Sequence, residues 1–152
     1  MNEYYKTSIQ NVFQIKSIVT VIYINSYEHV PGESHDFTEL LYVDKGNHSL
    51  EIDGVPYLLK EGQMIFFPPN SYHYGPVTTK ASLAIVSFET ESTELSCLYD
   101  KIITLTSSQK EFLSDIISNI NLFQAVPKGL DKIGKMPNED VTQGQLQILK
   151  NL

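Results

Sequence analysis

Short apolar runs rich in Val, Ile, Tyr and Phe alternate with turn-forming residues between about Phe13 and Glu89. This pattern predicts strands at residues 18–24, 38–43, 48–52, 57–60, 64–67, 72–74 and 83–88. The turn signals between them are Pro31-Gly32, Lys45-Gly46-Asn47, Asp53-Gly54, Glu61-Gly62 and Pro68-Pro69-Asn70. Asp-Gly favours a two-residue hairpin, because both central positions need positive φ. Closely spaced strands joined in this way predict an antiparallel barrel or sandwich rather than alternating βαβ units.

Alternation within the strands indicates which side chains face inward. In residues 48–52, His48 shares one face with two apolar residues, whereas Glu51 marks the solvent face. In residues 38–43 both faces are apolar, because Leu40 and Tyr42 lie opposite Leu41. We therefore expect a helix or a second subunit to cover the outer side of this sheet.

The pattern of apolar residues becomes helical after Thr106. Ser108-Gln109-Lys110-Glu111 has the form of a capping box, which predicts a helix start there. The helix should pack against the barrel through apolar residues at helical spacing, namely Phe112, Ile116, Ile120 and Phe123. We divide the chain into a barrel with an N-terminal arm (1–105) and a helical dimerisation segment (106–152).

The last apolar-periodic segment, 141–152, ends at Leu152 without a helix stop signal. Leu146, Leu149 and Leu152 would form one stripe of this helix, and a helix–helix contact between two copies of the chain would bury it. We therefore predict a homodimer. We also expect the chain to be the N-terminal part of a longer protein.

Charge excludes one class of function for this chain alone. All 11 basic residues are lysines, 18 residues are acidic, and the formal net charge is −7. Duplex DNA binding needs a basic face and favours arginine, so any DNA contact must come from a domain outside this chain. The one cysteine, Cys97, supplies neither a disulfide nor a cysteine-rich zinc site. The apolar runs are too short to cross a membrane and no signal peptide is visible, so we expect a cytoplasmic protein without a membrane partner.

The candidate chemistry lies in two stretches, 33–39 and 62–73. Glu33, His35 and Glu39 are even steps apart, so in an extended chain they project to one side. With His73 they make two carboxylates and two imidazoles that could converge inside a small barrel. Such a set could hold a divalent metal, perform acid–base chemistry or bind a polar ligand. His48 and Tyr23 are further candidate ligand contacts.

These stretches resemble the two motifs of the cupins. His35, Glu39 and Gly46 fit the first motif, although Glu33 stands where its first histidine is usual. In the second motif, a glycine, a proline and a histidine fit at Gly62, Pro68 and His73, with Asn70 at a position where glycine is usual. The resemblance implies a mostly β fold, a double-stranded β-barrel (jelly roll), with its site in the barrel mouth and often with a metal. Helices would follow the barrel at the C-terminal side.

More narrowly, residues 61–75 are similar to the signature of AraC/XylS-type bacterial transcription regulators. The similarity extends over about 23–88 and includes the order of a barrel followed by helices. It implies a cupin sensor domain that binds a small effector, then dimerisation helices, then a separate DNA-binding domain.

We accordingly predict a ligand-sensing and dimerisation domain rather than an enzyme, with no cofactor. A small polar effector, a sugar among the candidates, would be bound by His35, Glu39 and His73. The alternative is a small metal-dependent cupin enzyme, a dioxygenase or isomerase, in which these three residues and Glu33 surround a divalent ion. A third hypothesis is a barrel that has lost its ligand and only dimerises.

Overall fold

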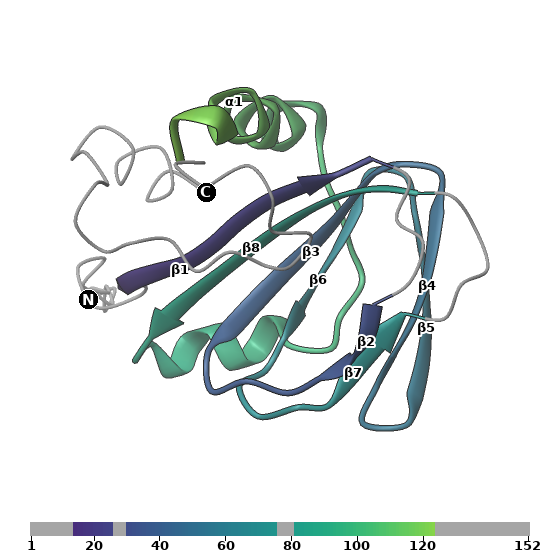
Figure 1. Ribbon diagram of the computed structural model, residues 1–152, viewed down its shortest axis with the longest axis vertical. Helices are drawn as coiled ribbons and strands as arrows, with labels where there is room; N and C mark the ends of the chain where they lie inside the picture. The colour runs from purple at the N-terminus through teal and green to yellow at the C-terminus, as the bar shows by residue number, and fades with distance from the viewer. Residues whose placement is uncertain (1–13, 26–29, 76–80, 124–152) are drawn as a thin grey trace, which may run out of the picture.

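The computed structural model describes residues 14–25, 30–75 and 81–123 (Figure 1). The strands in these ranges are β1 (Ile15–Ile24), β2 (Val30–Glu33), β3 (Thr38–Lys45), β4 (Asn47–Ile52), β5 (Val55–Lys60), β6 (Gln63–Phe67), β7 (His73–Gly75), β8 (Ser82–Thr90) and β9 (Ile103–Thr104). Two helices follow β8, the 3₁₀ helix η2 (Thr93–Leu98) and the α-helix α1 (Ser107–Phe123). All seven predicted strands are present, and β2 and β9 are additional.

The strands form two sheets that pack face to face. The five-stranded sheet has the order β1-β8-β3-β6-β9, and the four-stranded sheet has the order β2-β7-β4-β5. Every pairing between these strands is antiparallel. This is a jelly-roll sandwich, which confirms the predicted mostly β, cupin-like fold.

Two apolar cores lie on opposite faces of the five-stranded sheet. The inner core, between the sheets, contains Leu41 of β3 together with Leu50 of β4. The outer core contains Leu40 and Tyr42 of β3, covered by side chains that include Leu113 of α1. The expectation that a helix covers the outer face is therefore confirmed.

The Asp53-Gly54 turn joins β4 to β5 as predicted. Asp53 has a φ of 47° and Gly54 a φ of 82°, the pair of positive values that a two-residue hairpin needs. The prediction of a turn at Pro31-Gly32 is wrong. Both residues belong to β2, which pairs with β7 at the edge of its sheet, a position where proline is tolerated.

An irregularity in β1 sets the orientation of one side chain at the cavity. Ile18 pairs with Phe88 and Thr20 pairs with Ser87, so the strand gains one residue between them, at Val19. Such a bulge reverses the alternation of faces. Ile18 consequently packs in the outer core, whereas Thr20 faces inward.

Helix α1 begins two residues earlier than the sequence pattern predicted. The capping box is formed by Thr106 and Gln109: the Thr106 amide donates to the Gln109 side chain at 2.9 Å, and the Gln109 amide donates to Oγ1 of Thr106 at 3.4 Å. Phe112 was expected in the core but is 48% exposed, whereas Leu113 is 2% exposed. The predicted dimerisation residues Leu146, Leu149 and Leu152, and the arm at 1–10, lie outside the described residues.

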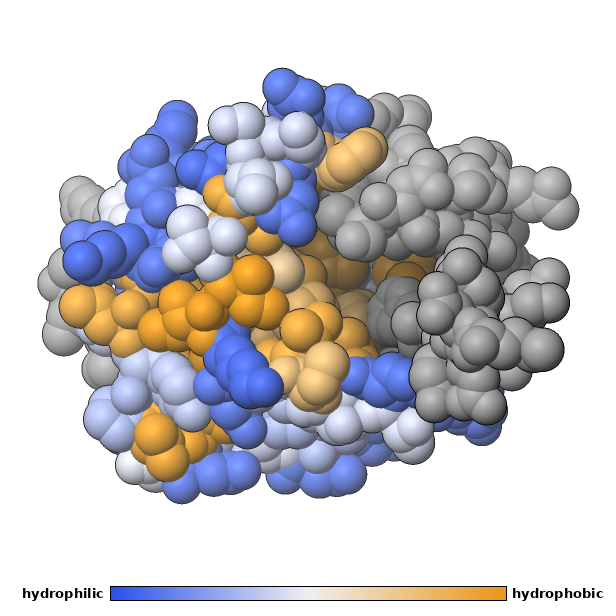
Figure 2. Space-filling model, turned by 180° about the vertical axis from the view of Figure 1, so that it is seen from behind, coloured by the Kyte–Doolittle hydropathy of each residue, from blue (hydrophilic) through white to orange (hydrophobic). Residues whose placement is uncertain are grey.

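Some large apolar side chains remain on the surface. Val55 and Leu58 of β5, together with Ile102 and Phe112, are each at least two-fifths exposed. Figure 2 shows apolar residues forming a band across the rear face of the molecule, bordered by hydrophilic residues. Contiguous apolar surface of this kind is frequent at protein–protein contacts. Within the described residues, no helix has the length and apolar character needed to span a membrane.

Candidate functional site

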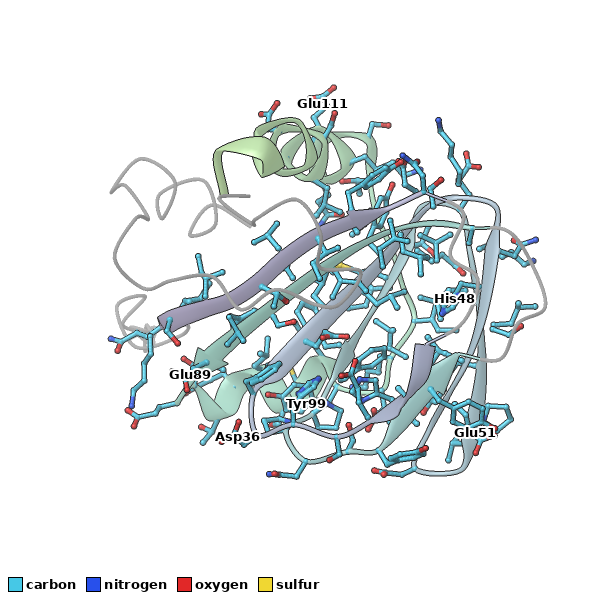
Figure 3. All side chains as sticks on the ribbon, viewed as in Figure 1. Asp36, His48, Glu51, Glu89, Tyr99 and Glu111 are labelled. Carbon is cyan, nitrogen blue, oxygen red and sulfur yellow. The ribbon has the colours of Figure 1, made fainter. Side chains whose placement is uncertain are left out.

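A partly open cavity of about 60 Å³ lies between the two sheets. Figure 3 shows His48 pointing from β4 toward this interior, whereas Glu51 of the same strand points away from it. Most of the wall is apolar, and the polar groups gather at one end. The lining residues are Thr20, Ile22, Ile24, Glu33, Glu39, Leu41, His48, Leu50, Phe67, His73, Tyr74, Gly75 and Ile85.

The four predicted residues come together at the polar end. Glu33 pairs with His73 across the β2–β7 ladder, and Glu39 begins the inward face of β3. Nε2 of His73 lies 3.9 Å from Oε1 of Glu39 and 4.0 Å from Oε1 of Glu33. Nε2 of His35 lies 3.5 Å from Oε2 of Glu39. We call these residues, Glu33, His35, Glu39 and His73, the polar cluster.

Backbone carbonyl groups fix both histidine rings in the same way. Nδ1 of His35 lies 2.9 Å from the Phe37 carbonyl oxygen, and Nδ1 of His73 lies 3.3 Å from the Ser71 carbonyl oxygen. A carbonyl oxygen only accepts, so each Nδ1 carries a proton and each Nε2 is directed at the cluster. The rings also stack, His35 on Phe37 and His73 on Phe67. Both Nε2 atoms are buried and have no hydrogen-bond partner among the described residues.

A buried chain of hydroxyl groups holds Glu39. The Ser87 hydroxyl of β8 donates to Oε2 of Glu39 at 2.8 Å, and the Thr20 hydroxyl of β1 donates to Oγ of Ser87 at 2.7 Å. Sequence analysis missed both hydroxyl residues. Ser87 could have been found, because it follows Leu83 and Ile85 at the inward positions of its strand. Thr20 could not have been found, because the bulge at Val19 changes the face that its side chain takes and the sequence does not reveal the bulge.

The pKa values of His35 and His48 are shifted in opposite directions. Burial alone would lower the pKa of His35, but the Glu39 carboxylate, with Oε2 3.5 Å from Nε2 of His35, outweighs burial, so the pKa of His35 is raised. His48 is buried and lines the cavity together with Leu50 of the same strand. Burial therefore lowers the pKa of His48 from 6.5 to about 4.

The polar cluster also fits a divalent metal ion. Ligand atoms of His35, Glu39 and His73 lie within 4.8 Å of one another. Imidazole nitrogen and carboxylate oxygen are suitable ligands for first-row divalent ions, and the backbone bonds at Nδ1 leave Nε2 free to bind one. Glu33 is close enough to complete the set that was predicted from the sequence.

The two remaining candidate contacts behave differently. His48 is buried and lines the cavity, as its alternation predicted. Tyr23 lies outside the cavity, because Ile22 and Ile24 on either side of it take the inward face of β1. Its hydroxyl donates to Asp44 at 2.6 Å instead. Of the two candidate contacts, His48 therefore lines this cavity and Tyr23 does not.

The family is decided by a match that spans most of the described sandwich. Residues 19–105 match the AraC-like ligand binding domain, which is more than half of the 152 residues. The chain belongs to this family. No curated protein matches this AraC-like domain.

Solved structures similar to the AraC-like domain include cupins of low sequence identity. A cupin protein from Bacteroides fragilis is 19% identical, with 69% of this chain and 100% of that chain covered and a TM-score of 0.42. A cupin-2 domain containing protein from Shewanella frigidimarina is 13% identical, with coverages of 57% and 82% and a TM-score of 0.38. The DMSP lyase DddQ from Ruegeria pomeroyi is 19% identical, with coverages of 55% and 40% and a TM-score of 0.40.

The polar cluster and the cavity lie inside the part of the AraC-like domain that carries the family match. All four cluster residues and His48 fall within residues 19–105, and the family description is that of a ligand-binding domain. The resemblance to regulators of this type, first noted in residues 61–75, is confirmed.

Proposed function

We propose that this chain is the effector-sensing and dimerisation part of a cytoplasmic bacterial transcription regulator. The observation that carries the proposal is the polar cluster at one end of a largely apolar cavity, inside an AraC-like ligand binding domain. A small effector enters between the sheets and makes its polar contacts with His35, Glu39 and His73. The apolar wall and His48 contact the rest of the molecule.

The structure offers a route from the effector to the helices. Glu39 is hydrogen-bonded through Ser87 to Thr20 of β1, and α1 packs beside β1 (Figure 1). An effector that favours one arrangement of Glu39 thereby favours one arrangement of β1 and α1. Dimerisation through residues beyond α1, among them Leu146, Leu149 and Leu152, would pass this preference to a DNA-binding domain outside the chain. Since the chain has no arginine, DNA contact belongs to that domain.

A second candidate function is that of a metal-dependent cupin enzyme. It is favoured by the two unpartnered Nε2 atoms beside a carboxylate, a donor set that divalent metals accept. A bound ion would supply Lewis-acid chemistry at the polar cluster. In that case Glu33, His35, Glu39 and His73 would hold the ion, and the apolar wall would position a substrate beside it.

The test is a thermal-shift screen of the chain against sugars, sugar acids, other small metabolites and divalent metals. A ligand at 100 times its Kd adds about 2.7 kcal/mol of stability, which raises Tm visibly for a domain of this size. The screen is repeated with Glu39→Gln and with the control Glu89→Gln, which removes an exposed carboxylate far from the cavity. An organic hit that Glu39→Gln abolishes and Glu89→Gln retains supports the sensor.

Two other outcomes contradict the sensor proposal. A response to metals alone, together with stoichiometric iron, manganese or nickel in protein purified without chelator, supports the enzyme. If no compound in the panel raises Tm, dimerisation remains as the role of the domain.

A further inference from the structure

Three members of the polar cluster, Glu33, Glu39 and His73, present hydrogen-bond acceptors to the same space. Glu33 and Glu39 contribute carboxylate oxygens. His73 has its Nδ1 proton engaged by the Ser71 carbonyl oxygen, so in its neutral form Nε2 presents a lone pair. This Nε2 atom is buried, unpartnered and within 4.0 Å of both carboxylates, and His73 is 6% exposed. Three acceptors thus lie close together, and among the described residues no donor is hydrogen-bonded to Nε2 of His73.

The ligand must therefore bring the donors. Glu39 is buried, and its Oε2 already receives the Ser87 hydroxyl, so it is Oε1 that faces His73 and remains available. The Glu33 side chain is 39% exposed and stands at the rim of the cavity. A buried carboxylate that lacks a donor or a positive charge costs free energy, and a cationic N–H group removes that cost.

The remainder of the cavity restricts the ligand in a different way. Among the described residues no lysine lines the cavity, and the chain has no arginine, so a carboxylate or phosphate on the ligand would find neither of these two cations there. The walls are mostly apolar, and the aliphatic side chains of Ile22, Leu41 and Ile85 are among those that line the space. A sugar would place most of its hydroxyl groups against carbon, where they lose their hydrogen bonds to water.

The size of the cavity limits the length of the ligand. One water molecule needs about 10–15 Å³ measured in the same way, so about 60 Å³ accommodates roughly four to six non-hydrogen atoms.

We propose that the effector is a small aliphatic amine, whose ammonium group donates to Glu39, Glu33 and Nε2 of His73 while its short carbon chain lies along the aliphatic wall. An ammonium ion has three N–H donors for the three acceptors, and it brings the positive charge that the carboxylates need. The inference rests on the proposed function and names the chemical class of its effector. The amine replaces the sugar that the sequence analysis named as a candidate effector.

The test is an NMR titration of the 152-residue chain at pH 7 with n-butylamine, 1-butanol, butyrate, glucose and Zn²⁺ in parallel. The amine and the alcohol have the same size, so they differ only in charge and in donor number. We expect n-butylamine to saturate, with the shifts centred on β2, β3 and β7, and 1-butanol to bind at least tenfold more weakly. Butyrate should not bind.

Two variants assign the contact to the carboxylates. Glu39→Gln and Glu33→Gln should each weaken n-butylamine binding at least tenfold, and Glu89→Gln should leave its Kd unchanged. Glu33 is at the rim, so its variant is expected to fold even where Glu39→Gln does not, and the NMR spectrum itself reports folding.

The other outcomes separate this inference from the proposed function. Saturable binding of 1-butanol, butyrate or glucose in the same cavity without binding of the amine overturns the amine and retains the sensor. Binding of Zn²⁺ alone overturns the amine in favour of a metal site. An unchanged Kd in both carboxylate variants overturns the assigned contacts, and failure of every probe overturns the amine and counts against the sensor.

Discussion

The hydroxyl group of Ser87 donates a 2.8 Å hydrogen bond to Oε2 of Glu39, and both residues are buried. The two residues pair across β3 and β8, in the middle of the five-stranded sheet. The bond therefore fixes a cavity carboxylate to the sheet rather than to a loop. It leaves Oε1, the other oxygen of Glu39, directed at His73.

Ser87→Ala removes the donor and leaves Glu39 buried with one acceptor unsatisfied. We expect the free energy of unfolding to fall by about 1–3 kcal/mol. Urea denaturation measures it, and Ser82→Ala on the same strand is the matched control, because the Ser82 hydroxyl contacts Asn25 at 3.5 Å and Tyr23 rather than Glu39. Equal stabilities for the two variants would contradict a structural role for this hydrogen bond.

His48 should make the domain less stable in mild acid. Its pKa is lowered from 6.5 to about 4, so between these values the unfolded chain binds a proton that the folded domain does not. The free energy of unfolding should consequently fall as pH decreases through this window, by up to about 3 kcal/mol for this residue.

The measurement is the difference between wild type and His48→Gln in urea denaturation at pH 7 and pH 4.5. A difference is needed because the raised pKa of His35 acts in the opposite sense. The loss on acidification should be smaller in the variant. If both proteins lose the same stability, His48 does not titrate with a lowered pKa.

A side chain at residue 32 would meet the ring of Tyr72. A Cβ atom there would overlap with the hydroxyl oxygen and with Cζ of Tyr72. Gly32→Ala should therefore destabilise the wild-type domain, because the ring must leave its place over β2. In a Tyr72→Ala background the same change should cost much less. A double-mutant cycle on the midpoints of thermal unfolding checks the coupling, and additive effects would show that the ring adjusts freely.

Thr106, and not Ser108, caps α1. Thr106→Ala removes the side-chain acceptor of the Gln109 amide and should cost about 0.5–2 kcal/mol of stability. Ser108→Ala lies inside the helix, where alanine is favoured, so it should be neutral or slightly stabilising. The helix start is checked by comparing the free energies of unfolding of the two variants. If Ser108→Ala lowers the free energy of unfolding more than Thr106→Ala does, the N-cap is Ser108, as the sequence pattern predicted.

The sequence predicted the fold well because period-2 alternation and Gly-containing turns act locally. Asp53-Gly54 has to turn, and His48 has to face inward beside Leu50, whatever the rest of the chain does. Most of the candidate site was predicted for a related reason. Glu33, His35, Glu39 and His73 were identified by residue type and motif spacing, and the structure brings them together.

What the sequence did not predict depends on register and on contacts distant along the chain. The bulge at Val19 changes the face of Thr20, and only its pairing with β8 reveals the change. The face taken by Tyr23 could not be predicted, because an aromatic residue with a hydroxyl group suits either face of a strand. The strand at Pro31-Gly32 exists because β7 provides a partner, which outweighs the local preference for a turn.

Strand β3 separates two cores with alternate side chains, and this has a consequence for how the domain can diversify. Glu39 and Leu41 face the cavity, whereas Leu40 and Tyr42 face the layer beneath α1. Substitutions at the odd positions change the lining of the cavity, whereas substitutions at the even positions change the packing between the sheet and the helix. The two surfaces can therefore diversify at alternate residues of a single strand.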